Sequence, residues 1–252
     1  MIISRKLAVA SVLAVSALSF ASVGCEDPAQ NVASAAVDSA KPVPPPPPAK
    51  TQSAAATNAN SAAPATTSAP TATATATAAA DAKPAKPDGG LDVVLADSKV
   101  EFTGSKVTGK HDGKFEKFSG WAYIDGDKLD TARMYVEIEV GSLKSDSEKL
   151  DGHLKTDDFF SVEKFPTATF QLTELKKGGA DGASHTITGN LKMRGVEKSV
   201  SFPAKVTLGK DDVKATAEFK INRKDWGITY EGKKDDLIRD EVVIRLDIHA
   251  KK

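Results

Sequence analysis

The chain has 252 residues, with 34 Lys and Arg against 34 Asp and Glu, so its formal net charge at pH 7 is zero. Nucleic acids and anionic membrane surfaces require a strongly electropositive face, and this balance argues against either as the main binding partner. Cys25 is the only cysteine, which excludes a disulfide within the chain.

Residues 1–24 have the pattern of a secretory signal peptide. Two basic residues precede an apolar run at 7–20 that is too short to span a bilayer comfortably. Small residues then lead into Cys25, as in bacterial lipoproteins, where the cysteine carries the lipid. We therefore expect lipidation of Cys25 and a lipid-anchored protein on the periplasmic side of the bacterial cell envelope, at the inner or outer membrane. The alternative is an ordinary signal peptide with an incidental thiol.

Residues 25–90 are expected to form a disordered tether. From residue 26 to 90 the chain contains no Leu, Ile, Met, Phe, Tyr or Trp, and it is rich in Ala, Pro and Thr. Such a segment buries too little apolar surface to offset the entropy lost on ordering. A coil of this length averages roughly 45 Å from end to end. The tether is therefore predicted to hold the following domain clear of a membrane.

Residues 91–252 are expected to form one domain, built mainly from strands. Each predicted strand has one apolar and one polar face, which is typical of an antiparallel sheet with one wet side. The predicted strands cover residues 99–106, 117–124, 133–140, 168–175, 186–194, 200–208, 214–221 and 241–248. Eight such antiparallel strands can close into a barrel that holds one small ligand. A sandwich of two sheets is the rival architecture.

Connections in this domain are short. Asp112-Gly113, Asp125-Gly126 and Asp181-Gly182 are predicted hairpin turns, since these dipeptides favour the tight turns that join antiparallel strands. One helical insertion is expected near residues 145–160. It has a polar half and ends in the pair Phe159-Phe160, which could plug an open barrel end.

Because the outer faces carry the charges, the apolar faces must point into the barrel, unlike a membrane barrel, which turns its apolar face to lipid. Small residues at inward positions leave space for an apolar guest. These are Ala168, Gly189, Ala204, Ala215 and Ala217. A solid core of packed side chains remains the alternative on this pattern alone.

Five blocks, in order along most of residues 92–250, resemble the YceI-like family. The most specific is the combination of Asp151-Gly152-His153-Leu154, Asp158-Phe159-Phe160 and Phe165-Pro166-Thr167-Ala168-Thr169-Phe170. The other four are Asp97–Phe102, Phe118-Ser119-Gly120, Gly189–Val196 with Pro203, and Arg223–Ile228. Trp226 stands where the family usually has Phe, and Met193-Arg194 where it usually has Leu-His.

The resemblance implies a periplasmic, lipocalin-like antiparallel β-barrel of eight strands that encloses an isoprenoid chain of a polyprenyl or quinone type. The side chains expected to contact it are Val136, Ile138, Phe159, Phe160, Phe170, Leu191, Phe202, Phe219 and Trp226. His153 and Arg223, together with Lys155, are head-group candidates because they lie in connections near a barrel mouth. The alternatives are a hydrogen bond that fixes the helical turn for His153, and an ion pair with Asp158 or Asp225 for Arg223.

The sequence contains no recognisable catalytic pattern. Its four histidines are widely spaced, and a nucleophile elbow, a phosphate-binding loop and a dinucleotide fingerprint are all missing. We therefore expect a non-enzymatic protein with no cofactor and no metal, which holds a lipid for sequestration or transport. A homodimer is left open. The alternative function is a packed-core structural or stress-related interaction module without a ligand.

Overall fold

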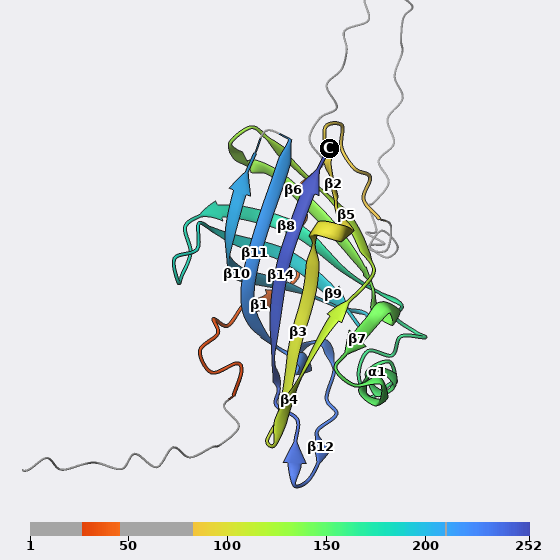
Figure 1. The fold of residues 1–252 in the computed structure, drawn as a ribbon. Helices are drawn as coiled ribbons and strands as arrows, with labels where there is room; N and C mark the ends of the chain where they lie inside the picture. The colour runs from red at the N-terminus through yellow and green to blue at the C-terminus, as the bar shows by residue number, and fades with distance from the viewer. Residues whose placement is uncertain (1–26, 46–82, 210) are drawn as a thin grey trace, which may run out of the picture.

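The computed structural model describes residues 27–45, 83–209 and 211–252 (Figure 1). Cys25, the predicted signal peptide and residues 46–82 of the predicted tether lie outside the described residues. The described strands are β1 (Ala36–Ser39), β2 (Leu91–Val93), β3 (Lys99–Lys106), β4 (Gly109–Phe115), β5 (Phe118–Asp125), β6 (Lys128–Glu139), β7 (Leu143–Ser145), β8 (Thr167–Lys177), β9 (His185–Met193), β10 (Val196–Leu208), β11 (Asp212–Asn222), β12 (Gly232–Lys233), β13 (Asp236–Leu237) and β14 (Glu241–Lys251). The described α-helix is α1 (Glu148–Leu154).

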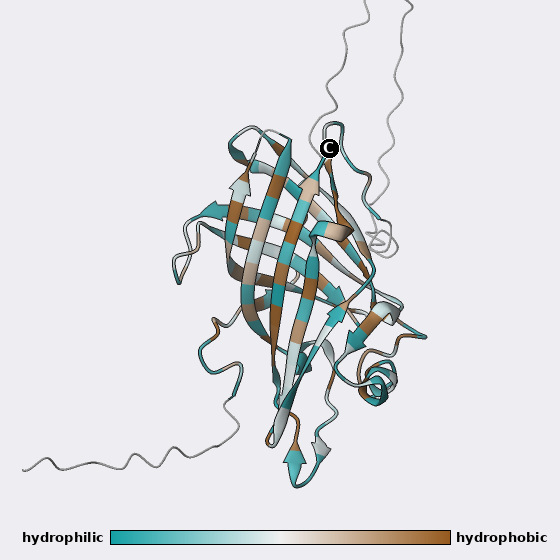
Figure 2. Ribbon diagram, viewed as in Figure 1, coloured by the Kyte–Doolittle hydropathy of each residue, from teal (hydrophilic) through white to brown (hydrophobic). Residues whose placement is uncertain are grey.

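The strands close into an antiparallel barrel of eight, as predicted, and not into a sandwich. β2 and β3 follow one another along β14, β4 continues into β5, and β6 into β7. The ring therefore runs β14, β2–β3, β4–β5, β6–β7, β8, β9, β10 and β11, and β11 pairs with β14 to complete it. Apolar and polar residues alternate along many strands of this ring (Figure 2).

One of the three predicted turns is wrong. Asp112-Gly113 lies inside β4, and the β3–β4 hairpin turns instead at residues 107–108. Gly113 serves packing here, since a Cβ at this position would lie 2.3 Å from Cζ of Phe102, the residue opposite it on β3. The predicted turns at Asp125-Gly126 and Asp181-Gly182 are confirmed between β5 and β6 and between β8 and β9.

Part of the predicted disordered tether is ordered against the barrel. Residues 27–45 lie along the barrel, and within them β1 pairs with β10 from Lys198 to Ser201. Asn190 on β9 clamps the segment further along, where its Nδ2 donates to the Lys41 carbonyl at 2.7 Å and its Oδ1 accepts from the Lys41 amide at 2.9 Å. Composition failed to predict this because backbone pairing with an existing edge requires few large apolar side chains.

The barrel interior contains one large cluster of buried side chains, here called the lumen cluster: Ala132, Leu172, Ile187, Val200, Phe202, Ala204, Phe219, Ile221 and Trp226. The rings of Phe202 and Phe219 stack at 4.0 Å between centroids. Gly189 does not leave the free space expected of it, because the ring of Phe170 occupies the place of a Cβ. A small inward residue therefore does not by itself indicate empty volume, because a neighbouring ring can fill the space.

Other inward side chains keep part of their surface exposed although they lie in mid-strand. They include Ile138, Phe170, Leu191, Ile244 and Leu246. In a solid core such side chains are covered on all sides by their neighbours. Their partial exposure indicates that the interior is not completely filled.

Candidate ligand-binding site

One end of the barrel opens into a cavity of about 300 Å³, here called the mouth. It lies between the β3–β4 hairpin, helix α1 and the segment 230–238. This volume is at the lower end of the range of about 300–1,000 Å³ found for small-molecule pockets. Its lining residues are Phe102, Gly104, Ser105, Lys106, His111, Leu150, His153, Leu154, Phe159, Tyr230, Gly232, Lys233, Asp236 and Ile238.

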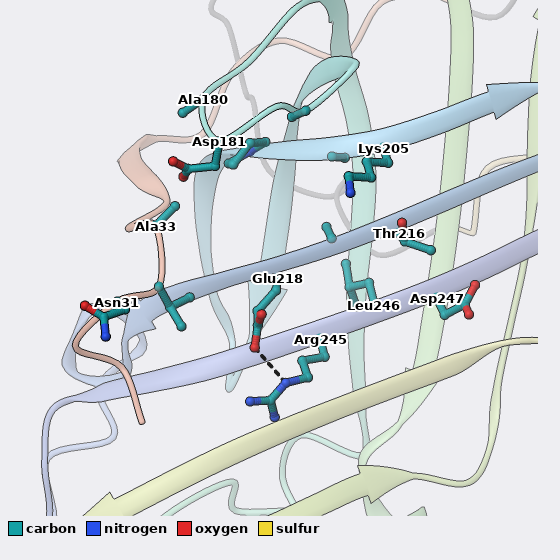
Figure 3. Close-up of a pocket in the computed structure, with 15 residues that line it drawn as sticks. Asn31, Ala33, Ala180, Asp181, Lys205, Thr216, Glu218, Arg245, Leu246 and Asp247 are labelled. Atoms are coloured by element: carbon teal, nitrogen blue, oxygen red, sulfur yellow. Dashed lines mark hydrogen bonds and ion pairs between the residues drawn. The ribbon is translucent and has the colours of Figure 1, made fainter. Parts of the chain in front are cut away.

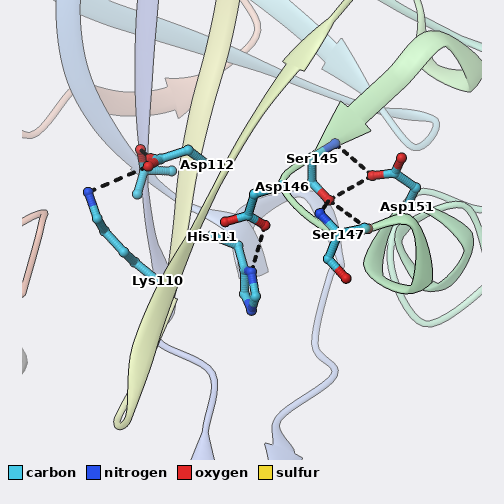
Figure 4. Close-up of polar contacts among 8 residues, drawn as sticks. Lys110, His111, Asp112, Ser145, Asp146, Ser147 and Asp151 are labelled. Atoms are coloured by element: carbon cyan, nitrogen blue, oxygen red, sulfur yellow. Dashed lines mark hydrogen bonds and ion pairs between the residues drawn. The ribbon is translucent and has the colours of Figure 1, made fainter.

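Helix α1 is held at the mouth by the buried side chain of Asp151 (Figure 4). Its carboxylate accepts hydrogen bonds from the backbone amide of Ser145 at 2.6 Å and from the Ser145 hydroxyl at 2.7 Å. Lys144 adds a longer ion pair at 3.5 Å. The Ser145 hydrogen bonds lower the pKa of Asp151, so the carboxylate is ionised and joins α1 to β7 at neutral pH.

Aromatic rings form the apolar wall of the mouth. The imidazole of His153 meets the rings of Phe159 and Tyr230 edge-on, at 5.0 and 5.1 Å between centroids, and these two rings contact each other at 5.4 Å. Nearby, Phe160 packs edge-on against Phe115 at 6.1 Å. The predicted aromatic plug is therefore assembled at a barrel end, with Tyr230 as a member that the sequence did not suggest.

The opposite side of the mouth is polar. Lys106 forms an ion pair with Asp236, and this hydrogen bond lowers the pKa of the Asp236 carboxyl. His111 lies 2.8 Å from Asp146 (Figure 4). Ser105 is buried, and within the described part of the chain its Oγ has no hydrogen-bond partner. Since buried hydroxyls are nearly always satisfied, this unpaired oxygen makes Ser105 a candidate contact for a polar group.

The apolar wall of the mouth packs against the barrel interior. Its buried side chains are Phe102, Leu143, Leu154, Phe159 and Ile228, and both Met193 and Ile244 pack against this group and against the lumen cluster. At the other end, between β5, β6 and β11, a cavity of about 50 Å³ has an almost entirely apolar lining. An apolar surface thus extends from the polar rim of the mouth along the inner wall.

Most of the predicted contact residues lie along this surface. Phe170, Leu191, Phe202, Phe219 and Trp226 belong to the lumen cluster or pack against it. The indole of Trp226 is fully buried and donates to the Leu191 carbonyl at 3.1 Å. Phe159 and Phe160 are at the mouth, buried Val136 lies opposite Phe170, and Ile138 packs against the wall formed by Val100, Phe118 and Ile248.

The two head-group candidates have different surroundings. His153 lines the mouth, and its Nε2 lies 2.9 Å from Asp158, a contact that also fixes the turn after α1. Arg223 is buried, and its guanidinium donates to the carbonyls of Arg239, Ile228 and Ile238. Its carboxylate partner is Asp240 at 3.4 Å, and not Asp158 or Asp225 as considered from the sequence. Arg223 therefore joins two connections, and Lys155 does not line the mouth.

Sequence reasoning missed Ser105, His111, Tyr230 and Asp236 as residues of one cavity. They come from segments far apart in the chain that meet only when the β3–β4 hairpin packs against 230–238. Within the described ranges, no group of three or more His, Cys, Asp or Glu side chains is arranged to hold a metal ion. Nor does the described part of the chain contain a helix long and apolar enough to cross a bilayer.

Comparison with known proteins assigns the fold to a family. The YceI-like domain matches residues 91–250. The chain belongs to the YceI-like family. Among curated relatives, a UPF0312 protein of Enterobacter sp. strain 638 is 37% identical over 123 residues, and the match covers 46% of this chain and 62% of that protein. Protein YceI of Salmonella arizonae is 36% identical over 123 residues, covering 46% and 63% of the two chains. This chain thus spans less than two thirds of these relatives.

Two solved structures share the barrel. BcnA of Burkholderia cenocepacia is 26% identical with a TM-score of 0.57, over 63% of this chain and 99% of that one. A domain from Saccharophagus degradans, described as polyisoprenoid-binding and implicated in plant cell wall breakdown, is 15% identical with a TM-score of 0.51. That match covers 64% of this chain and 97% of that domain. At this identity the second likeness concerns the fold alone.

Proposed function

We propose that this YceI-like barrel is an envelope lipid-binding protein that holds an isoprenoid-type chain, polyprenyl or quinone-like, for sequestration or transport. The observation that carries this proposal is the apolar surface that runs from the mouth past Met193 and Ile244 to Trp226. It is lined by mid-strand side chains that remain partly exposed inside the barrel. The polyisoprenoid-binding description of the Saccharophagus domain is consistent with the same guest.

Apolar contact alone gives enough affinity for such a guest. Each buried methylene group contributes about 0.8 kcal/mol. A few isoprene units therefore exceed the roughly 8 kcal/mol of micromolar binding before the costs of association are subtracted. The protein's role in this proposal is burial of the chain, with no bond made or broken. The polar head group lies at the mouth, near the Ser105 hydroxyl and His153.

We also propose that Cys25 carries the lipid anchor expected from the sequence, on the periplasmic side of the envelope. Asp27 pairs with Arg239 at 2.5 Å, and Arg239 directly follows Ile238, which lines the mouth. One residue spans at most about 3.6 Å, so two residues keep Cys25 within about 7 Å of Asp27. The anchor would then lie close to the mouth side of the barrel, and not at the far end of the long disordered tether expected from composition.

The lipid-binding proposal is tested by purifying the protein from bacterial envelopes and analysing the intact complex by native mass spectrometry, followed by organic extraction. The expected result is a bound mass that is released on extraction and identified as an isoprenoid-type lipid. Repeated isolation of an empty protein that also fails to bind geranylgeraniol or ubiquinone added in micelles would contradict the proposal.

The anchor is tested with a Cys25→Ser variant. We expect the native protein to incorporate labelled palmitate and to fractionate with membranes, and the variant to do neither. An unlabelled native protein found in the soluble periplasmic fraction would show that the thiol is incidental.

A second candidate function, a packed-core interaction module without a ligand, is favoured by one observation. The stacked rings of Phe202 and Phe219 and the Phe170 ring against Gly189 fill part of the interior. The same native mass spectra distinguish the two functions, because the module would carry a second protein and no lipid.

A further inference from the structure

The barrel ring has a seam between β10 and β11. β10 pairs with β11 only from Lys205 to Leu208, whereas it pairs with β9 from Val196 to Ala204. β11 instead follows β14 along its whole length. Before Lys205, the two barrel strands have therefore separated, and the edge of each lacks a partner from the eight-stranded ring.

Residues 33–39, here called the strap, fill this seam. On one side β1 pairs antiparallel with β10, with Val37 opposite Val200. On the other side Lys220 of β11 exchanges two backbone hydrogen bonds with the strap, donating to Ala33 and accepting from Ala35, both at 2.9 Å. The strap is thus a ninth strand inserted between two strands of the ring. Between Val196 and Ala204 of β10, backbone pairing reaches β11 only through the strap.

The seam leads directly to the proposed lipid site. Ala35 and Val37 of the strap pack against the lumen cluster, and Val200 beneath the strap is only 1% exposed. At the start of the strap, beside residues 31–33, a groove of about 520 Å³ lies across β10, β11 and β14 (Figure 3). Its lining includes residues 31–33, the β8–β9 loop, outward-facing side chains such as Lys205, Glu218 and Arg245, and the inward-facing Ala204 and Ala217.

The strap is attached to the barrel by weaker side-chain contacts than helix α1 at the mouth. α1 is fixed by the buried Asp151 carboxylate and by packed rings, whereas the strap contributes two partly buried small side chains, Ala35 and Val37, and backbone pairing. The strap is also covalently linked to the barrel, because residues 40–90 connect it to β2. Such a link gives an effective local concentration on the order of millimolar, so reclosing within one molecule is favoured over exchange between two.

We propose that the strap is a detachable strand that closes a lateral portal into the lumen, and that the apolar guest passes between β10 and β11 when the strap is released. This inference rests on the proposed lipid-binding function and assigns the route by which that site is loaded. A lateral route suits an amphiphile, because the tail can slide between the strands while the head group stays in water.

A disulfide across the strap tests this route. Ala36 and Ser201 are directly opposite each other on the outward faces of β1 and β10. Opposed residues on antiparallel strands have Cα separations of about 4.5–5.5 Å, within the range that a disulfide bridges. The variant Ala36→Cys/Ser201→Cys is made in the full chain with Cys25→Ser. The control pair, Lys214→Cys/His249→Cys, links β11 to β14 outside this groove, at a pairing in which the strap takes no part.

The measurement is stopped-flow fluorescence with geranylgeraniol carrying an anthraniloyl group, on the oxidised and reduced forms. We expect oxidation to slow both association and dissociation at least tenfold in the strap pair, with an unchanged ratio of the two rates and no change in the control pair. Equal rates in the two forms would overturn the portal while leaving lipid binding intact. A lack of probe binding in both forms would overturn the proposed function itself and the portal with it.

A second variant acts in the opposite direction and does not depend on a disulfide. Asn190→Ala removes both hydrogen bonds to Lys41 and loosens the strap at its far end. Association and dissociation should each become about three- to tenfold faster, and the amides of Ala35 and Lys220, which bond across the seam, should exchange faster with solvent. Faster exchange without faster probe binding would show that the strap detaches but does not guard the route.

Discussion

Asp151 in α1 accepts two hydrogen bonds from Ser145 in β7, one from the backbone amide and one from the hydroxyl. This contact explains the Asp of the Asp-Gly-His-Leu block in structural terms. The carboxylate fixes the helix. In the same helix, the His153 ring contacts the rings of Phe159 and Tyr230, and the Leu154 side chain is buried. The block therefore builds the wall of the mouth.

The Asp151→Asn variant should lower the free energy of unfolding at pH 7 by about 1–2 kcal/mol, because a charged acceptor of two hydrogen bonds is replaced by a neutral one. The pKa of Asp151 is lowered in the folded state. Its stabilisation is thus complete above the unfolded-state pKa, about 3.9, and is lost as the pH falls through the lowered pKa. Urea unfolding at pH 7 and at pH 2.5 should show the difference shrinking. Glu148→Gln in the same helix is the control, and an equal difference at both pH values would contradict the assignment.

Gly113 and Phe102 should be energetically coupled. Gly113→Ala places a methyl group in the ring of Phe102 and should cost about 1–3 kcal/mol through overpacking. Phe102→Leu in the same chain should recover part of that cost, as a double-mutant cycle of unfolding free energies would measure. Gly109→Ala, in the same strand with nothing within 4 Å of the added methyl, serves as the control. Simple additivity of the two substitutions would exclude this packing.

The Ser105 hydroxyl should contribute to head-group preference and not to tail affinity. Removing it with Ser105→Ala should weaken binding of geranylgeraniol by about three- to tenfold, the effect of one hydrogen bond of about 1 kcal/mol. Binding of a hydrocarbon of the same length without the hydroxyl should be unchanged. Competition titrations with the two ligands provide the comparison, and equal losses for both would place the head group elsewhere.

Adding volume inside the barrel should weaken binding, whereas the same addition outside should not. Ala217 faces the lumen cluster, and its neighbour Thr216 faces the other side of β11. Ala217→Met should reduce affinity for geranylgeraniol about tenfold, since the added side chain occupies room needed by the guest. Thr216→Met should leave it within about twofold. Equal affinities in both variants, measured by fluorescence titration, would argue against a guest in this part of the lumen.

Much of the barrel was predictable because inward and outward residues alternate along each strand, as in Met134, Val136 and Ile138 of β6. β4 and β7 escaped prediction for the opposite reason: Lys-His-Asp-Gly-Lys carries no apolar alternation, and its pairing with β3 is imposed by the hairpin. The strap escaped because an inserted strand is stabilised by backbone edges that belong to β10 and β11.

The site was predictable in part. Large aromatic residues such as Phe202, Phe219 and Trp226 lie inside because burial of their area favours it, and the alternation places them on the correct face. Arg223 also looks exposed in sequence, yet three backbone carbonyls satisfy its guanidinium in a buried position. The mouth depends on contacts between β3, α1 and the 230–238 segment, which no local pattern encodes.

The central claim, an isoprenoid-type chain held inside the barrel, is tested most directly by photo-cross-linking. A geranylgeranyl probe with a diazirine in its tail is bound to the full chain, irradiated, and located by peptide mass spectrometry. The expected adducts are on inward side chains such as Phe170, Leu191 and Leu246, and an excess of unlabelled geranylgeraniol should abolish them. Adducts confined to outward residues, or labelling that the competitor does not reduce, would contradict a guest in the lumen.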